Sequence, residues 1–140
     1  MIFVKMTTKK KMTHTFYQNI GKLFYALAAS DKQVRDEEFN KLKVIVKKQW
    51  LNAEIVKDDL NSKAVYQIEY VFEWLNKNEK LNAKMYFDDF LKYKEKHPLL
   101  FTEAIKKLIL KTAHAIAASF SGLNKSELIM LAKLDIELKR

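Results

Sequence analysis

Residues 26–39, ALAASDKQVRDEEF, decide the fold, because a related stretch, AIAASFSGLNKSEL, occupies residues 115–128. Each stretch is an Ala-rich helix end, a short turn, and a second helix that opens with an acid, so that Glu38 aligns with Glu127. Small side chains let helix backbones approach closely, and we expect the two copies to pack face to face at the centre. The alanines expected at this crossing are Ala28, Ala29, Ala117 and Ala118. The repeat therefore predicts two helix-turn-helix halves that superpose on each other.

Outward from the repeat, apolar residues recur every three or four positions, which is typical of amphipathic helices. The chain has only two Gly and one Pro in 140 residues, too few to punctuate a many-stranded protein. We predict an all-α, compact, single-domain bundle of about six to seven helices over residues 15–140, preceded by a flexible basic lead over residues 1–14. The expected helices cover about 16–30, 36–49, 63–76, 82–96 and 102–120, with a last one from a cap at Asn124 to Leu138.

Several helix ends carry recognisable signals. Thr15 with Gln18 resembles a capping box at the start of the first helix, and Thr102 is placed to cap the fifth. Pro98 stops the fourth helix, because the residue before proline avoids the helical region. The same spacing predicts that Met85 and Leu128 face the core, and we expect His114, beside small alanines, to be packed and hydrogen-bonded.

Composition limits the function classes. With no cysteine, the chain has no disulfide, thiolate zinc site or cysteine nucleophile, and a cytoplasmic location is the natural expectation. No stretch approaches the roughly 20 apolar residues of a membrane span. No histidine has a glutamate three residues before it, which excludes the Glu-x-x-His pairs of a di-iron site. Two glycines cannot build a phosphate-binding loop. We therefore predict no catalytic residues and no enzyme activity, with a metal-dependent enzyme as the least favoured class.

The net charge of +9 is carried almost entirely by lysine, since Arg35 and Arg140 are the two arginines among 26 basic residues. Lysine attracts polyanions as a point charge, whereas base readout favours arginine. Lys9, Lys10 and Lys11 make the lead a candidate contact for nucleic acid or an anionic membrane surface. Spread lysines are also typical of a plain solvated surface. The lead depends on where translation begins, for which the candidates are Met1, Met6 and Met12.

Aromatic residues gather on the third helix, where Tyr66, Tyr70, Phe72 and Trp74 are too widely spread around the helix for one stripe to bury them all. The larger part of the aromatic content belongs in the core. The remainder on this central helix indicates an exposed surface for a protein partner.

The repeated unit resembles the TerB-like family of tellurite-resistance-associated domains, through GKLFYALAASDKQVRDEEF at residues 21–39 and AHAIAASFSGLNKSELIML at 113–131. The resemblance covers about residues 16–138. It implies a compact helical bundle whose two helix-turn-helix halves are related by a pseudo-twofold axis. It also implies a bacterial-type stress-response protein, membrane- or nucleic-acid-linked complexes, and acids that hold a divalent metal. The family's Asp-Gly turn reads Asp31-Lys32 here, and its second-copy Asp is replaced by Phe120 or Ser121, which weakens a symmetric two-half site.

The acids at the first turn are the candidate metal ligands, because Ca²⁺ and Mg²⁺ take carboxylate oxygens. A cation would be held weakly through Asp31 and Glu38, with Asp36 or Glu37 assisting and Glu127 joining from the second copy. The alternative is that these acids only complement the helix dipole. No other cofactor is indicated.

Together these features predict a non-enzymatic, TerB-like binding or scaffold module associated with stress, including tellurite, resistance. It would contact a protein partner through the aromatics of the central helices. The alternative is a polyanion-binding module that uses the lysine-rich face and the lead.

Overall fold

The computed structural model describes residues 14–29, 36–51, 62–77, 82–119 and 125–139. All regular structure in these ranges is helical, and no strand occurs in them, which confirms the all-α prediction. The helix boundaries lie within two residues of those expected. The elements are α2 (His14–Ala28), α3 (Asp36–Leu51), α5 (Ser62–Lys77), α6 (Ala83–Lys96), the 3₁₀ turn η1 (Pro98–Leu100), α7 (Glu103–Ser119) and α8 (Lys125–Lys139).

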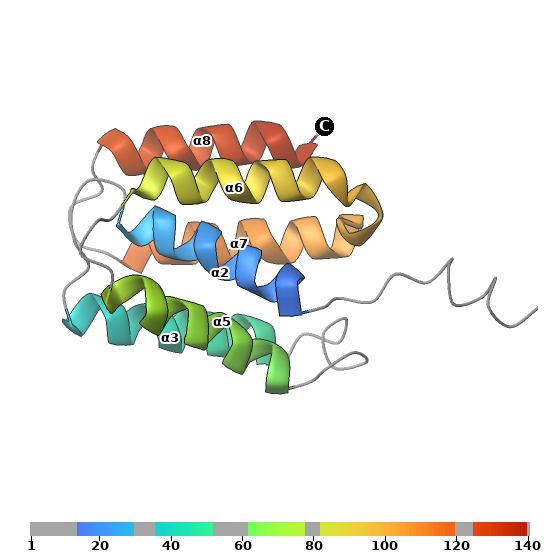
Figure 1. Ribbon diagram of the computed structural model, residues 1–140. Helices are drawn as coiled ribbons and strands as arrows, with labels where there is room; N and C mark the ends of the chain where they lie inside the picture. Colours follow the sequence, from blue (N-terminus) through green and yellow to red (C-terminus); the bar gives the residue numbers. More distant parts are fainter. Residues whose placement is uncertain (1–13, 30–35, 52–61, 78–81, 120–124, 140) are drawn as a thin grey trace, which may run out of the picture.

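The helices stack as three pairs (Figure 1): α6 with α8, α2 with α7, and α3 with α5. The middle pair lies between the other two, so its helices are the most enclosed, and the outer helices each keep one face toward solvent. Within the described residues, none of these helices combines the length and apolar character that a bilayer crossing requires.

Helix α2 is the centre of the bundle and contacts α3, α5, α6, α7 and α8. Its side chains are buried on nearly every side, as expected for a helix that is apolar all round. Gly21 lies where α5 comes closest: a Cβ there would stand 3.2 Å from the Val71 Cβ and 3.3 Å from the Ile68 carbonyl oxygen. Glycine therefore lets the α5 backbone approach. The fully buried side chains of α2 are Phe16, Tyr17, Ile20, Leu23, Phe24, Tyr25, Ala26 and Leu27.

The contacts between helices agree with two helix-turn-helix halves, α2–α3 and α7–α8. The two first helices contact each other, and each second helix contacts both first helices. Ala28, Ala29 and Ala117 are buried, as a close crossing requires, but Ala118 is exposed, so its predicted place in the crossing is wrong. The turns of the two halves, residues 30–35 and 120–124, lie outside the described residues.

Two side-chain hydrogen bonds, one buried and one part-buried, connect the layers. The Trp50 Nε1 donates to the Thr112 Oγ1 (2.9 Å), which donates in turn to the Leu108 carbonyl (2.8 Å), so α3 is tied to α7 with each polar atom satisfied. The Tyr25 hydroxyl donates to the Asn76 Oδ1 (2.6 Å), which ties α2 to the end of α5. Burial raises the pKa of Tyr25 to about 12, and the neighbouring Tyr86 is a second, smaller cause of the rise.

Of the predicted helix-end signals, Thr102 and Pro98 are confirmed and Thr15 is not, Asn124 lies outside the described residues, and Asn82 is a cap that was not predicted. The Thr102 Oγ1 accepts from the Ile105 amide (3.2 Å), and the Asn82 Oδ1 accepts from the Met85 amide (3.0 Å). Helix α6 ends at Lys96, directly before the His97-Pro98 stop. Helix α2, however, begins at His14, so Thr15 lies inside its first turn and is not the capping residue.

Three residues expected inside are on the surface. Met85 is 47% and Leu128 49% exposed, and His114 is also exposed, with its Nε2 3.3 Å from the Asp135 Oδ1. The residues that α6 buries are Tyr86, Phe87 and Phe90, and the leucines that α8 buries are Leu131, Leu134 and Leu138, so the core side of each helix is centred away from Met85 and Leu128. His114 pairs across the surface with α8 rather than entering the core.

Candidate interaction surfaces

The acids proposed as metal ligands do not form one group in the described residues. Asp36 and Glu37 are exposed in the first turn of α3, Glu38 is half-buried, and Glu127 is 2% exposed in the first turn of α8. The described chain holds no group of three or more His, Cys, Asp or Glu placed for a metal. Asp31 lies outside the described residues, so a cation at Asp31 and Glu38 stays a prediction.

Glu37 also borders an open hollow of about 460 Å³ beside α3. Its other lining residues are Asn40, Lys41, Val44 and Ile45 of α3 and Ser119 of α7, none of which is acidic. Among its described lining residues the hollow is mainly apolar and has one carboxylate, and a single carboxylate does not make a hard-cation site. The described acids of α3 fit a helix start, where negative charge complements the dipole.

The lysine lead, including Lys9, Lys10 and Lys11, lies outside the described residues, and its role in polyanion contact stays a prediction. The surfaces that the structure does describe are on the outer helices. Two of them, on α5 and α8, expose large apolar side chains in helical register.

The outward face of α5 is aromatic. Tyr66, Tyr70 and Trp74 are spaced by four residues, so they follow one stripe along the helix, and they are 58%, 66% and 59% exposed. Phe72 is fully buried with the inner side of the same helix. The predicted exposed aromatics are therefore present, with Phe72 as the member that belongs to the core. Tyr66, Tyr70 and Trp74 together form the aromatic face of α5.

One side of the aromatic face is joined to α3 by ion pairs. The Lys43 Nζ lies 4.0 Å from the Glu73 Oε1, and the Lys47 Nζ lies 3.9 Å from the Glu69 Oε2. Such pairs contribute little stability at a surface. They do place both signs of charge along the α3 side of the aromatic rings.

The outward face of α8 is aliphatic. Two of its residues are adjacent and the others follow at intervals of three and four, and three of the four are 48–59% exposed. The inward side of the same helix is also apolar, with Leu131, Leu134 and Leu138 buried. Apolar residues therefore lie on two sides of α8. The aliphatic face consists of Leu128, Ile129, Ala132 and Ile136.

The charged residues of α8 differ in exposure. Of the three acids in the described part of α8, Glu127 is buried, and Asp135 and Glu137 are half-buried, with the Asp135 Oδ1 3.3 Å from the His114 Nε2. The exposed charged residues are Lys125, Lys133 and Lys139. Lys125, Leu128, Ala132, Ile136 and Lys139 follow one another at intervals of three, four, four and three residues, which places a lysine at each end of the aliphatic face.

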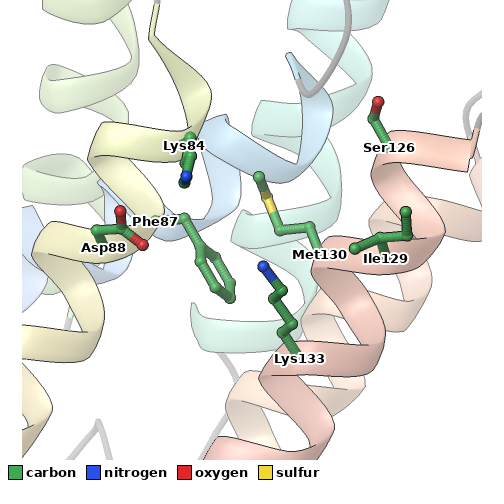
Figure 2. Close-up of a pocket in the computed structure, with 7 residues that line it drawn as sticks. All are labelled: Lys84, Phe87, Asp88, Ser126, Ile129, Met130 and Lys133. Carbon is green, nitrogen blue, oxygen red and sulfur yellow. The ribbon is translucent and has the colours of Figure 1, made fainter.

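A shallow groove of about 230 Å³ separates α8 from α6 beside the aliphatic face. Figure 2 shows Phe87 and Met130 between the two helices, with the amino groups of Lys84 and Lys133 directed toward the groove from opposite sides. Asp88 is the one acid among the described lining residues. Ser126 and Ile129 lie on the α8 side, so the groove continues into the aliphatic face.

No protein-family model, curated protein or solved structure matches this chain, so the resemblance to TerB-like domains stays a prediction carried by the repeat.

The aliphatic face is the surface that the sequence analysis missed. The signal was present: residues 128–138 contain more apolar residues than one inward stripe of a helix can hold. The prediction placed Leu128 in the core with Leu131, Leu134 and Leu138, and it assigned no role to Ile129, Ala132 and Ile136.

Proposed function

We propose that this chain is a non-enzymatic binding or scaffold module that docks on a partner protein through the aromatic face of α5. The observation that carries the proposal is the stripe Tyr66, Tyr70 and Trp74, each more than half exposed on a helix whose inner side is packed against α2. Exposed aromatics in register are costly to leave in water and are uncommon on surfaces without a partner.

The residue types support a protein partner. Tyr and Trp are enriched in protein interfaces and provide most of the residues whose truncation costs the most binding energy. Each has few rotatable bonds, so little entropy is lost when it is fixed, and each carries a polar group for a rim hydrogen bond. The paired charges on the α3 side supply a polar border of the kind that surrounds such anchors.

The resemblance to TerB-like domains would place this module in stress, including tellurite, resistance. That assignment and the weak Ca²⁺ or Mg²⁺ site at the first acidic turn rest on the repeated motif. The docking proposal rests on α5 alone, and it stands or falls separately.

The test compares the native chain with a Tyr66→Ser, Tyr70→Ser, Trp74→Ser variant in affinity capture from the native cell. All three positions are exposed, so we expect the variant to stay folded and to lose the partner, at high and at low salt. The matched control is Val44→Ser with Met85→Ser, which removes exposed apolar surface elsewhere. Capture of the same partner by both variants would contradict the proposal.

A second candidate function, polyanion binding, is favoured by one observation: the exposed charges of α8 are all lysine. Binding of this type weakens steeply with salt, whereas docking through aromatic rings does not. Salt dependence therefore separates the two functions.

A further inference from the structure

We propose that the aliphatic face of α8, with the lysines that border it, is a docking surface for an anionic lipid membrane. The proposal goes beyond docking through α5 and does not depend on it. The helix would lie in the plane of the bilayer surface, with Leu128 and Ile136 turned toward the acyl chains and the lysines at the level of the headgroups.

The placement of charge is the first argument. Lys125 and Lys139 lie at the two ends of the aliphatic face and Lys133 lies beside it, and these three lysines are exposed, whereas the acids in the described part of α8 are buried or half-buried. Lys84 adds a fourth amino group across the groove, against the single acid Asp88 (Figure 2). A basic border around an aliphatic centre is complementary to lipid that is anionic at its surface and apolar below.

The residue types favour a membrane over a protein. Lysine is depleted from protein interfaces, and leucine is under-represented among the residues that dominate their binding energy. The face has none of the Tyr, Trp or Arg anchors found in such interfaces. Leucine and isoleucine with lysine are instead the composition of helices that lie on a bilayer.

The same features argue against two other occupants. Nucleic acid presents phosphates and sugars, which give aliphatic side chains such as Ile129 no apolar partner. A second copy of the chain, docked face to face, would bring the lysines of one α8 toward those of the other, and like charges in an interface are unfavourable.

The first experiment is sedimentation of the full chain with vesicles of phosphatidylcholine and phosphatidylglycerol, and with vesicles of phosphatidylcholine alone. We expect binding to the anionic vesicles, weakened by salt, and little binding to the neutral ones. Absence of binding to the anionic vesicles overturns the proposal, as does binding to duplex DNA or to a protein with none to the vesicles.

The charge test uses two matched variants. Each lysine at an anionic surface contributes about fivefold in affinity, so Lys125→Gln, Lys133→Gln, Lys139→Gln should lose about 100-fold. The control removes the same charge from exposed lysines of α3 and α7, as Lys41→Gln, Lys48→Gln, Lys107→Gln, and should lose much less. Equal losses would show that net charge, and not α8, directs binding.

The apolar test uses Leu128→Ser with Ile136→Ser, which should weaken vesicle binding at least about tenfold. Both side chains are about half exposed, and an unchanged circular dichroism melting curve confirms that the variant is folded. The α5 triple serine variant is the control and should bind vesicles as the native chain does. Native-like binding by the α8 variant contradicts insertion, whatever the fate of the α5 partner.

A second measurement does not rely on loss of binding. Because the chain has no cysteine, Ala132→Cys takes a single nitroxide label on the aliphatic face, and Tyr70→Cys takes one on α5. Anionic vesicles should slow the label at residue 132 and shield it from aqueous relaxants, and leave the label at residue 70 mobile. The opposite pattern assigns the contact to α5 and overturns the proposal.

Discussion

Helices α5 and α8 lie at opposite outer layers of one bundle, and both leave an apolar stripe in water. On α5 the stripe is made of tyrosine and tryptophan, bordered by charges of both signs. On α8 it is made of leucine and isoleucine, bordered by lysine. The comparison shows that exposed apolar area alone does not identify a partner, because residue types and the sign of neighbouring charge also decide which partner each face suits.

The two helices also differ in how they are held. Helix α5 packs closely against α2 at Gly21, where the Ile68 carbonyl oxygen of α5 comes near. Two ion pairs also link α5 to α3. Helix α8 rests on α7 and α2 and leaves an open groove beside α6. A protein-docking face benefits from rigid anchors, since ordering costs are then lower. A helix on a bilayer needs no such fixed side-chain positions.

The largest expected effects separate the inner from the outer side of each helix. Phe72→Ala on α5 should cost about 3–5 kcal/mol and Leu134→Ala on α8 about 2–5 kcal/mol in unfolding free energy, because both side chains are fully buried. The outer substitutions Tyr70→Ser and Ile136→Ser should each stay within about 0.5 kcal/mol. Urea denaturation followed by circular dichroism measures all four. An outer variant as damaging as its inner counterpart would remove that face from the comparison.

Alkaline pH should loosen α5 more than α8, because Tyr25 bonds to Asn76 at the end of α5. The pKa of Tyr25 is about 12 in the folded state against about 10 unfolded. The unfolded chain therefore loses this proton first, and the stability held below pH ~10 declines as the pH rises to ~12, by about 1.4 kcal/mol per unit. Urea denaturation across this range measures the decline.

Tyr25→Phe is the control for this pH effect. It removes the titrating hydroxyl, and its stability should fall less steeply between the same pH values. An equally steep fall in the variant would assign the alkaline transition to another group.

Gly21→Val should overpack the crossing of α2 and α5 and cost about 1–3 kcal/mol. Its Cβ would already stand 3.2 Å from the Val71 Cβ and 3.3 Å from a backbone oxygen, which cannot rotate away. The shifted α5 should weaken partner capture, while vesicle binding through α8 is kept. Thermal unfolding measures the first effect, and an unchanged melting temperature would contradict the close approach.

The smallest expected effect concerns the acids at the start of α3. A cation bound with a dissociation constant of about 10⁻⁴–10⁻³ M would stabilise the chain by about 0.4–1.4 kcal/mol at about 1 mM Ca²⁺ or Mg²⁺. Asp31→Asn with Glu38→Gln should abolish the rise in melting temperature. A native chain indifferent to both cations would leave Asp36, Glu37 and Glu38 as helix-start acids.

Most of the fold could be predicted from the sequence, because apolar spacing and stop signals act locally. The spacing located each helix within two residues, and Thr102 and Pro98 located two of the boundaries. What spacing could not provide is how far a helix is enclosed. Met85 and Leu128 fit the apolar spacing of three or four residues, but the side chains that α6 and α8 bury are others.

The candidate surfaces were predictable to different degrees. The aromatic face followed from counting, because Tyr66, Tyr70 and Trp74 cannot share one buried stripe with Phe72. The aliphatic face of α8 could not be separated from the core in the same way, since leucine and isoleucine are ordinary core residues. That the exposed charged residues of α8 are lysines becomes visible only once the buried side of the helix is known.

Trp50 and Trp74, the two tryptophans of the chain, occupy opposite environments: the first is fully buried and donates to Thr112, and the second is 59% exposed on the aromatic face. Indole emission shifts toward the red in water and toward the blue in an apolar site, so the two rings emit in different parts of one spectrum. Trp50 then reports whether the core is intact, and Trp74 reports whether α5 is covered. The native chain thus carries two optical probes, and a Trp74→Phe variant leaves the core signal alone.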